Sequence, residues 1–100
     1  MSLPADQAAP GAETTRVPVT MYSTGFCGYC DRARALLNRK GITVDEIKVD
    51  EDPNERVTMV KRAGGRRTVP QIFVGDRHIG GYEELAQAER SGELDRLLKG

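Results

Sequence analysis

The chain has 100 residues, the size of one small domain, and its 15 lysine and arginine residues balance 15 aspartate and glutamate residues. This balance gives no field that favours nucleic acid, and no run of about 18 apolar residues predicts a membrane span. The first residues also lack the basic and apolar regions of a signal peptide, so we expect a cytoplasmic protein. Residues 1–16, rich in Ala, Pro, Gly and polar residues, are predicted to form a disordered tail before a domain at 17–100.

A strand is predicted before the two cysteines of the chain, and a helix is predicted after them. The strand is Val17–Tyr22, in which valine and methionine recur at alternate positions. The helix is Cys30–Lys40, because apolar residues recur there at spacings of three and four, as on one face of a helix. The inward stripe of this helix is predicted to be Ala33, Leu36 and Leu37.

The next strand and helix are separated by an acidic helix-start signal. Ile42–Val49 is predicted to be the second strand, since apolar and charged residues alternate in its second half. Asp52 is a suitable N-cap and Pro53 suits the first helical position, so a second helix is predicted to begin there. Its apolar positions, predicted to face inward, are Val57, Val60 and Ala63.

The last third of the chain has the pattern of a hairpin followed by two helices. Gln71–Val74 is strongly apolar, and the Gly-Asp pair after it suits a two-residue turn. Arg77–Ile79 then returns as the fourth strand, and Tyr82–Glu89 is predicted to be the third helix. A short final helix is indicated by Leu94, Leu97 and Leu98.

The order of these elements predicts an α/β fold. A strand, a helix and a second strand place two parallel strands side by side through a right-handed crossover. The hairpin then adds two strands that run antiparallel to each other. We therefore expect a four-stranded mixed sheet flanked by helices, with a small core for a packed part of this length.

The cysteine pair is the main candidate for chemistry. Cys27 and Cys30 are separated by two residues and lie where the first strand leads into the first helix. The first turn of a helix has unpaired backbone N–H groups and a partial positive charge, both of which favour a thiolate. We therefore expect Cys27 to have a pKa below that of an ordinary thiol, and Cys30 to be able to form a disulfide with it.

A Cys-x-x-Cys pair can also be half of a zinc site or a structural disulfide. A zinc site needs about four ligands, but there is no second cysteine pair and the single histidine, His78, lies far along the chain. We expect His78 on the surface of the hairpin rather than at the cysteines. A disulfide that closes so short a loop would restrict the unfolded chain little. The residue pattern therefore favours a redox pair and predicts no metal site.

Three motifs taken together resemble the glutaredoxin family, which has the thioredoxin-like fold. They are the Cys-Gly-Tyr-Cys at Cys27–Cys30, the Thr-Val-Pro at Thr68–Pro70 and the Gly-Gly-Tyr-Glu at Gly80–Glu83. Their order and spacing carry the resemblance, which extends over essentially all of the chain except the tail. It implies a glutathione-dependent thiol–disulfide oxidoreductase that reduces glutathione mixed disulfides and protein disulfides through its two cysteines.

The resemblance also assigns roles to other residues. It implies a cis peptide bond between Val69 and Pro70, with the Val69 backbone available to pair with glutathione by β-strand addition. Arg66 and Arg67 lie where a basic group could bind the glycyl carboxylate, and the start of the third helix suits the γ-glutamyl end. The expected glutathione-binding residues are Tyr29, Arg66, Arg67, Thr68, Val69, Pro70, Gly81, Tyr82 and Glu83.

Two further functional classes stay open at this point. The family resemblance includes members that hold a [2Fe–2S] cluster, which would make the chain a dimer with Cys27 of each subunit and two glutathiones as ligands. An interaction module with incidental cysteines is the third class. As an oxidoreductase the chain is expected to act as a monomer on glutathione and on disulfide or glutathionylated proteins. Thr24 replaces the lysine of many relatives, so the lowering of the Cys27 pKa is expected to be smaller than in those relatives.

Overall fold

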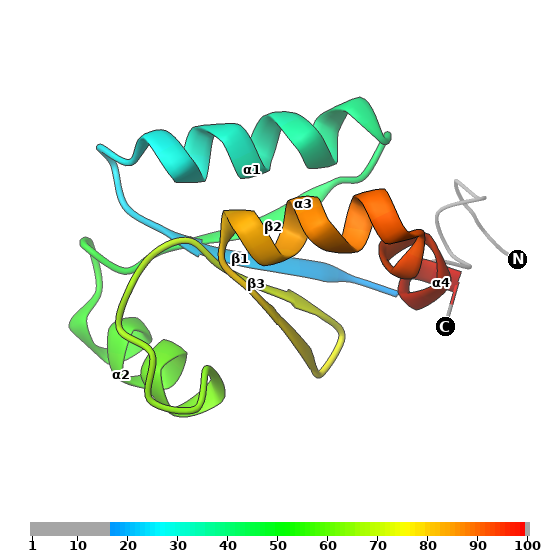
Figure 1. The fold of residues 1–100 in the computed structure, drawn as a ribbon. Coiled ribbons are helices and arrows are strands. Elements are labelled where there is room, and N and C mark those ends of the chain that lie inside the picture. The colour runs from blue at the N-terminus through cyan, green and yellow to red at the C-terminus, as the bar shows by residue number, and fades with distance from the viewer. Residues whose placement is uncertain (1–16, 100) are drawn as a thin grey trace, which may run out of the picture.

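The computed structural model describes residues 17–99, so the predicted tail at 1–16 lies outside the described residues. This part of the chain forms four strands and four helices, whose arrangement is drawn in Figure 1. In chain order they are β1 (Val19–Ser23), α1 (Gly28–Arg39), β2 (Val44–Lys48), α2 (Pro53–Arg62), β3 (Gln71–Val74), β4 (Arg77–Gly80), α3 (Tyr82–Ser91) and α4 (Glu93–Lys99).

The strands form one mixed sheet in the order β2-β1-β3-β4. β1 and β2 are parallel, with Val19 opposite Val44, and α1 is the crossover between them. β3 is antiparallel to β1 and to β4, so the hairpin extends the sheet on the side away from β2. The predicted four-stranded mixed sheet is therefore confirmed. Gly75 in the hairpin turn has a φ of 59°, the left-handed backbone that favours glycine.

The two faces of the sheet are covered unequally. Figure 1 shows α1 and α3 over one face and α2 over the other. Because side chains alternate along a strand, Val19 and Met21 of β1 point to the α1 and α3 face, whereas Tyr22 points to the α2 face. The larger core contains Val19, Met21, Ala33, Leu36, Leu37, Ile42, Ile72, Val74, Leu85, Ala88, Leu94 and Leu98. The smaller core contains Tyr22, Val49, Met59, Ala63 and Phe73.

The structure moves the predicted starts of three elements by two residues each. β1 begins at Val19 rather than at Val17. α1 begins at Gly28 rather than at the second cysteine, because Cys27 serves as its N-cap. β2 begins at Val44, two residues later than predicted, because Val44 and Ile47 pack on opposite faces of the sheet and only the residues from Val44 onward pair with β1. Val44 is out of phase with Ile47 in the sequence because the two side chains pack against different faces of the sheet.

The predicted inward position of Val57 is wrong. Its side chain is 54% exposed, and Met59 instead is completely buried in the smaller core. With 3.6 residues per turn, positions two apart on a helix differ by about 200°, so only one of these side chains can face the sheet. Val60 and Ala63 lie beside Met59, as their spacing requires.

No helix within residues 17–99 is long and apolar enough to cross a membrane.

The connections that matter for the site meet at one end of the sheet. Figure 1 shows the start of α1, the link from β2 to α2 and the link from α2 to β3 all at this end, with the start of α3 beside them. The N-terminal part of β1 and helix α4 lie at the opposite end, where the Val17 amide donates to the Leu98 carbonyl oxygen at 3.1 Å.

Candidate active site

The site is built on the first turn of α1. Cys27 has extended backbone angles (φ −151°, ψ 104°), as an N-cap residue should, and its Sγ accepts a hydrogen bond from the Cys30 amide at 3.1 Å. Cys27 and Cys30 are joined by a disulfide with their Cα atoms 5.1 Å apart. Cys27 is partly exposed, whereas Cys30 is 1% exposed. Only the first sulfur is therefore accessible to a partner, and the amide beside it would stabilise negative charge on that sulfur.

A loop before β3 contacts the accessible sulfur. The Val69–Pro70 peptide bond is cis, as predicted, and the Val69 carbonyl oxygen lies 3.8 Å from Cys27 Sγ. Gln71 is completely buried, and its side-chain amide donates to the Thr68 carbonyl oxygen at 3.0 Å and to the Thr68 hydroxyl at 3.2 Å. The buried glutamine thus ties the loop to the sheet, a role that its apolar surroundings in the sequence did not reveal.

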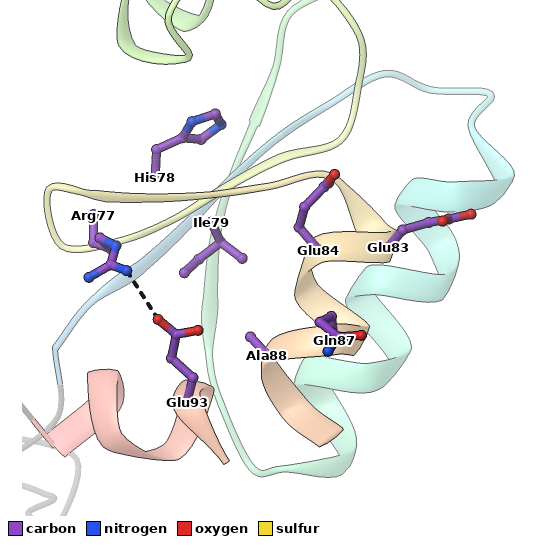
Figure 2. Close-up of a pocket in the computed structure, with 8 residues that line it drawn as sticks. All are labelled: Arg77, His78, Ile79, Glu83, Glu84, Gln87, Ala88 and Glu93. Atoms are coloured by element: carbon purple, nitrogen blue, oxygen red, sulfur yellow. Dashed lines mark hydrogen bonds and ion pairs between the residues drawn. The ribbon is translucent and has the colours of Figure 1, made fainter. Parts of the chain in front are cut away.

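His78 supports this glutamine from the neighbouring strand. Its Nε2 lies 2.7 Å from Gln71 Oε1, and its ring stacks on Phe73 with centroids 4.8 Å apart. Burial, aided by the positive charge of Arg66, holds the pKa of His78 below its ordinary value of 6.5. Figure 2 shows His78 and Ile79 leaving β4 on opposite sides, with Ile79 toward α3 and His78 away from it. His78 thus lies at the surface of the hairpin with its ring partly buried against Phe73 of the smaller core.

The start of α3 is held by a carboxylate that the sequence analysis did not identify. Glu84 accepts a hydrogen bond from the Gly81 amide at 2.7 Å, and this bond is the main reason that the pKa of Glu84 is lowered. Arg66 Nη1 lies 3.7 Å from the same carboxylate oxygen. A side chain at Gly80, where φ is 121°, would collide with Glu84. Glu84 is the third residue after the Gly81 N-cap, a spacing at which a capping glutamate is common.

A groove of about 410 Å³ lies beside these groups. On one of its sides the rings of Tyr29 and Tyr82 stack at a centroid distance of 6.2 Å, and the Arg32 guanidinium lies 5.3 Å from the Tyr29 ring centroid. The groove is lined by Tyr29, Arg66, Thr68, Val69, Pro70, Gly81, Tyr82, Glu83 and Glu84.

The structure thus gathers the predicted binding residues around one groove, with a single exception. Arg67 does not line this groove but a separate hollow beside α2. Arg66, its neighbour, lines the groove and approaches Glu84. Within residues 17–99, no group of three or more His, Cys, Asp or Glu side chains is arranged to hold a metal ion.

A partly exposed disulfide at the start of a helix can exchange with a disulfide or thiol in another molecule. Together with the sheet order and the cis-proline loop, it defines the class of the protein: a thiol–disulfide oxidoreductase of the thioredoxin-like fold. Comparison with known proteins narrows this class, because the glutaredoxin family model matches residues 19–79. The chain belongs to the glutaredoxin family.

Individual relatives cover nearly the same part of the chain. The glutaredoxin of Pseudomonas aeruginosa is 47% identical over 81 residues, which are 81% of this chain and 95% of that protein. Glutaredoxin 3 of Escherichia coli K12 is 46% identical over 81 residues, which are 81% of this chain and 96% of that protein. The predicted family resemblance is confirmed by these relatives.

Solved structures agree with the fold. The solution structure of the glutaredoxin from Brucella melitensis has a TM-score of 0.74 at 45% identity, covering 91% of this chain and 95% of that one. The crystal structure of a buckwheat glutaredoxin–glutathione complex also has a TM-score of 0.74, at 29% identity, covering 87% of this chain and 83% of that one. The predicted thioredoxin-like fold is confirmed.

Proposed function

We propose that the protein reduces mixed disulfides between proteins and glutathione, with free glutathione as the reductant. The observation that carries this proposal is the groove of about 410 Å³ next to Cys27 Sγ. Its lining includes the guanidinium of Arg66 and the first residues of α3. Support also comes from the buckwheat relative, which was crystallised as a glutathione complex. Protein disulfides are the second proposed substrate class, as for other dithiol proteins of this fold.

The groove offers three kinds of contact that suit a tripeptide with two carboxylates. The Val69 backbone carbonyl lies beside the sulfur, and this backbone can pair with the cysteinyl residue of glutathione. The Arg66 guanidinium can bind one carboxylate, in competition with Glu84. The unpaired amides in the first turn of α3, at Tyr82 and Glu83, suit the other carboxylate.

The chemistry follows from the exposure of the two sulfurs. The Cys27 thiolate attacks the glutathione sulfur of a mixed disulfide; a new S–S bond forms there, the old one breaks, and the substrate thiolate leaves and takes up a proton. A second glutathione thiolate then attacks the bound glutathione sulfur, which releases Cys27 and yields glutathione disulfide. With a protein disulfide, the Cys27 thiolate first attacks one substrate sulfur and forms a mixed disulfide, and the other substrate thiolate leaves and takes up a proton. The Cys30 thiolate then attacks Cys27 Sγ; the Cys27–Cys30 bond forms, the bond to the substrate breaks, and the second substrate thiolate leaves and takes up a proton.

The test is turnover of a small glutathione mixed disulfide by two cysteine variants. We expect Cys27→Ser to abolish turnover, because no thiolate then faces the groove. Cys30→Ser should keep most of the activity, because glutathione itself resolves the intermediate. Equal loss in both variants would contradict the assignment of the nucleophile. The Cys30→Ser variant should still lose reduction of protein disulfides, which needs the second cysteine.

The absorption spectrum of the freshly purified protein tests the alternative of a [2Fe–2S] carrier. A cluster needs four ligands on its irons, and Cys27 of one chain supplies one of them, so the carrier would be a dimer completed by two glutathiones. Visible absorption that disappears with Cys27→Ser, together with a dimer in solution, would favour the carrier. A colourless monomer that turns over the mixed disulfide is the result we expect.

Thr24 allows a test of what stabilises the thiolate. We propose that the start of α1, through its amides and its partial charge, is the main cause of a lowered Cys27 pKa. Thr24→Lys should lower this pKa further and tighten glutathione binding, as a cation near the sulfur would do. The measurement is the thiolate absorbance near 240 nm against pH in both proteins. A parent protein that titrates like a free cysteine would contradict activation by the helix.

We further propose that residues 17–100 form the catalytic domain and that it works as a monomer in the cytoplasm. A reduced cysteine pair suits that compartment, where thiol pools keep such pairs available for exchange.

A further inference from the structure

A second hollow lies beside the active site, and the proposed reaction does not use it. It measures about 530 Å³ and is formed by the end of the β2 connection, one side of α2 and the residue Arg67. Its apolar floor and wall consist of Val49, Pro53, Val57 and Val60. Val57 is 54% exposed, one of three exposed large hydrophobic side chains within residues 17–99.

Two residues that line the hollow are connected to segments next to Cys27. The Asp50 carboxylate, which lines the hollow, accepts a hydrogen bond at 3.0 Å from the Gly25 amide, two residues before Cys27. On the other side, Arg67 is two residues before Val69, whose carbonyl oxygen lies 3.8 Å from Cys27 Sγ. The neighbouring residues Arg66 and Arg67 thus line different cavities, Arg66 the groove and Arg67 the hollow.

Phe26 is a second exposed apolar side chain, next to the nucleophile. It directly precedes Cys27 in the sequence and its side chain is fully exposed. A polypeptide whose sulfur has reached Cys27 can therefore contact this apolar side chain.

The charge of the hollow selects the kind of polypeptide. Arg56, Lys61 and Arg67 line it, whereas Asp50 is the one carboxylate in its lining and already accepts from the Gly25 amide. Within residues 17–99, the side chains of Lys61 and Arg67 take part in no ion pair. A patch with an apolar floor and unpaired cations at its rim complements an apolar side chain flanked by carboxylates.

We propose that this hollow binds the polypeptide half of a glutathionylated protein substrate, as an extended segment with an apolar residue and nearby Asp or Glu. The inference rests on the proposed function, because it assumes that the glutathione half occupies the groove. Binding both halves at once would orient the mixed disulfide over Cys27 Sγ before the exchange. The exchange itself is unchanged, and the hollow determines which proteins are preferred.

The experiment uses the full chain and two glutathionylated synthetic peptides that share a leucine and the modified cysteine. One peptide carries two glutamates beside the leucine and the other carries two lysines. A small glutathione mixed disulfide without a peptide serves as the third substrate. We expect kcat/KM for the acidic peptide to exceed that for the basic peptide by about fivefold or more, which is the scale of one or two exposed charge pairs.

Matched variants locate the effect. Val57→Glu places a carboxylate in the hollow, four residues before Lys61; Ala35→Glu makes the same charge change on the exposed side of α1, four residues before Arg39. Val57→Glu should lower kcat/KM for the acidic peptide by about fivefold and leave the small substrate unchanged, whereas Ala35→Glu should change neither. Lys61→Gln and its control Arg39→Gln should repeat this contrast with a smaller effect.

The outcomes separate the two proposals. Equal turnover of the two peptides, or equal effects of Val57→Glu and Ala35→Glu, would overturn the docking site while turnover of the small substrate upheld the proposed function. A parent protein that fails on the small substrate would overturn both. A concentration-dependent dimer that Val57→Glu dissociates would assign the hollow to a second copy of the chain and would also overturn substrate docking.

Discussion

The two faces of the sheet differ in the side chains that pack against them. The face under α1, α3 and α4 has a core composed entirely of apolar side chains, with its charged pairs at the rim. The face under α2 has a smaller core, in which polar groups are interleaved with aromatic rings. The first face supplies most of the apolar burial, whereas the second also holds the loop that touches the nucleophile. Stability and site geometry are thus largely divided between the two faces.

The polar groups of the α2 face are connected. The Arg62 guanidinium lies 4.1 Å from the Phe73 ring centroid and donates a hydrogen bond to the Tyr22 hydroxyl at 2.9 Å. His78 stacks on the same phenylalanine and bonds to Gln71, which in turn bonds to the loop before β3. A substitution on this face should therefore alter the groove, because His78 and Gln71 form a hydrogen-bonded chain that ends at the loop before β3.

The largest expected effect is on the apolar face. Leu37 is completely buried in the larger core, so Leu37→Ala should lower the free energy of unfolding by about 3 kcal/mol. The KM for a glutathione mixed disulfide should change little, because Val69, in the loop before β3, packs against the smaller core. Urea unfolding and steady-state kinetics measure the two quantities. Val57→Ala, at an exposed site, is the control and should change stability by less than about 0.5 kcal/mol.

Gln71→Leu should produce a smaller loss of stability and a larger loss of binding. It leaves the Thr68 carbonyl oxygen and His78 Nε2 without their partner, at a cost of about 2 kcal/mol. Because the loop before β3 loses its tie to the sheet, KM for the mixed disulfide should rise, in contrast to Leu37→Ala. The comparison fails if both variants change KM to the same extent.

The Arg34–Glu46 ion pair lies at the edge of the apolar face, and its contribution to stability can be measured. Arg34 donates to both Glu46 carboxylate oxygens, at 2.9 and 2.6 Å, and these bonds lower the pKa of Glu46 to about 2. Since the folded pKa is below the unfolded one, the stabilisation is complete above the unfolded value of about 4.5 and is lost as the pH falls toward 2.

Glu46→Gln should therefore cost about 1 kcal/mol at pH 7, after allowance for the partial exposure of the pair to solvent. The difference in unfolding free energy between parent and variant should shrink as the pH falls from 4.5 toward 2. KM should not change. A difference that persists at the lowest pH at which both proteins fold would assign the effect to packing rather than to the carboxylate charge.

The smallest expected effect concerns His78 on the polar face. Its folded pKa lies below its unfolded one, so the folded protein favours the neutral ring and becomes less stable as the pH falls below about 6.5. The loss should be less than about 1 kcal/mol, because the ring is only partly buried. His78→Gln should remove this part of the pH dependence of Tm between pH 7.5 and 5. An unchanged slope would show that another group titrates in this range.

The sequence by itself determined the features that depend on neighbours a few residues away. The N-cap at Asp52, the strand–helix junction at Cys27 and the hairpin turn at Gly75 are local signals, and all three appear in the structure. Apolar patterning indicated the existence and order of the four strands, and the spacing of three motifs indicated the family. The residues expected around the groove followed from those motifs rather than from any property of the individual residues.

The tertiary structure decided what depends on distant segments. Cys27 and Val69 are 42 residues apart in the sequence, and only folding brings the loop to the sulfur. The same is true of Glu84, which meets Arg66 across the groove. Arg66 and Arg67 look equivalent in the sequence, but the turn of the chain between them sends one side chain to the groove and the other to the hollow. Such assignments depend on packing between elements, which no local pattern encodes.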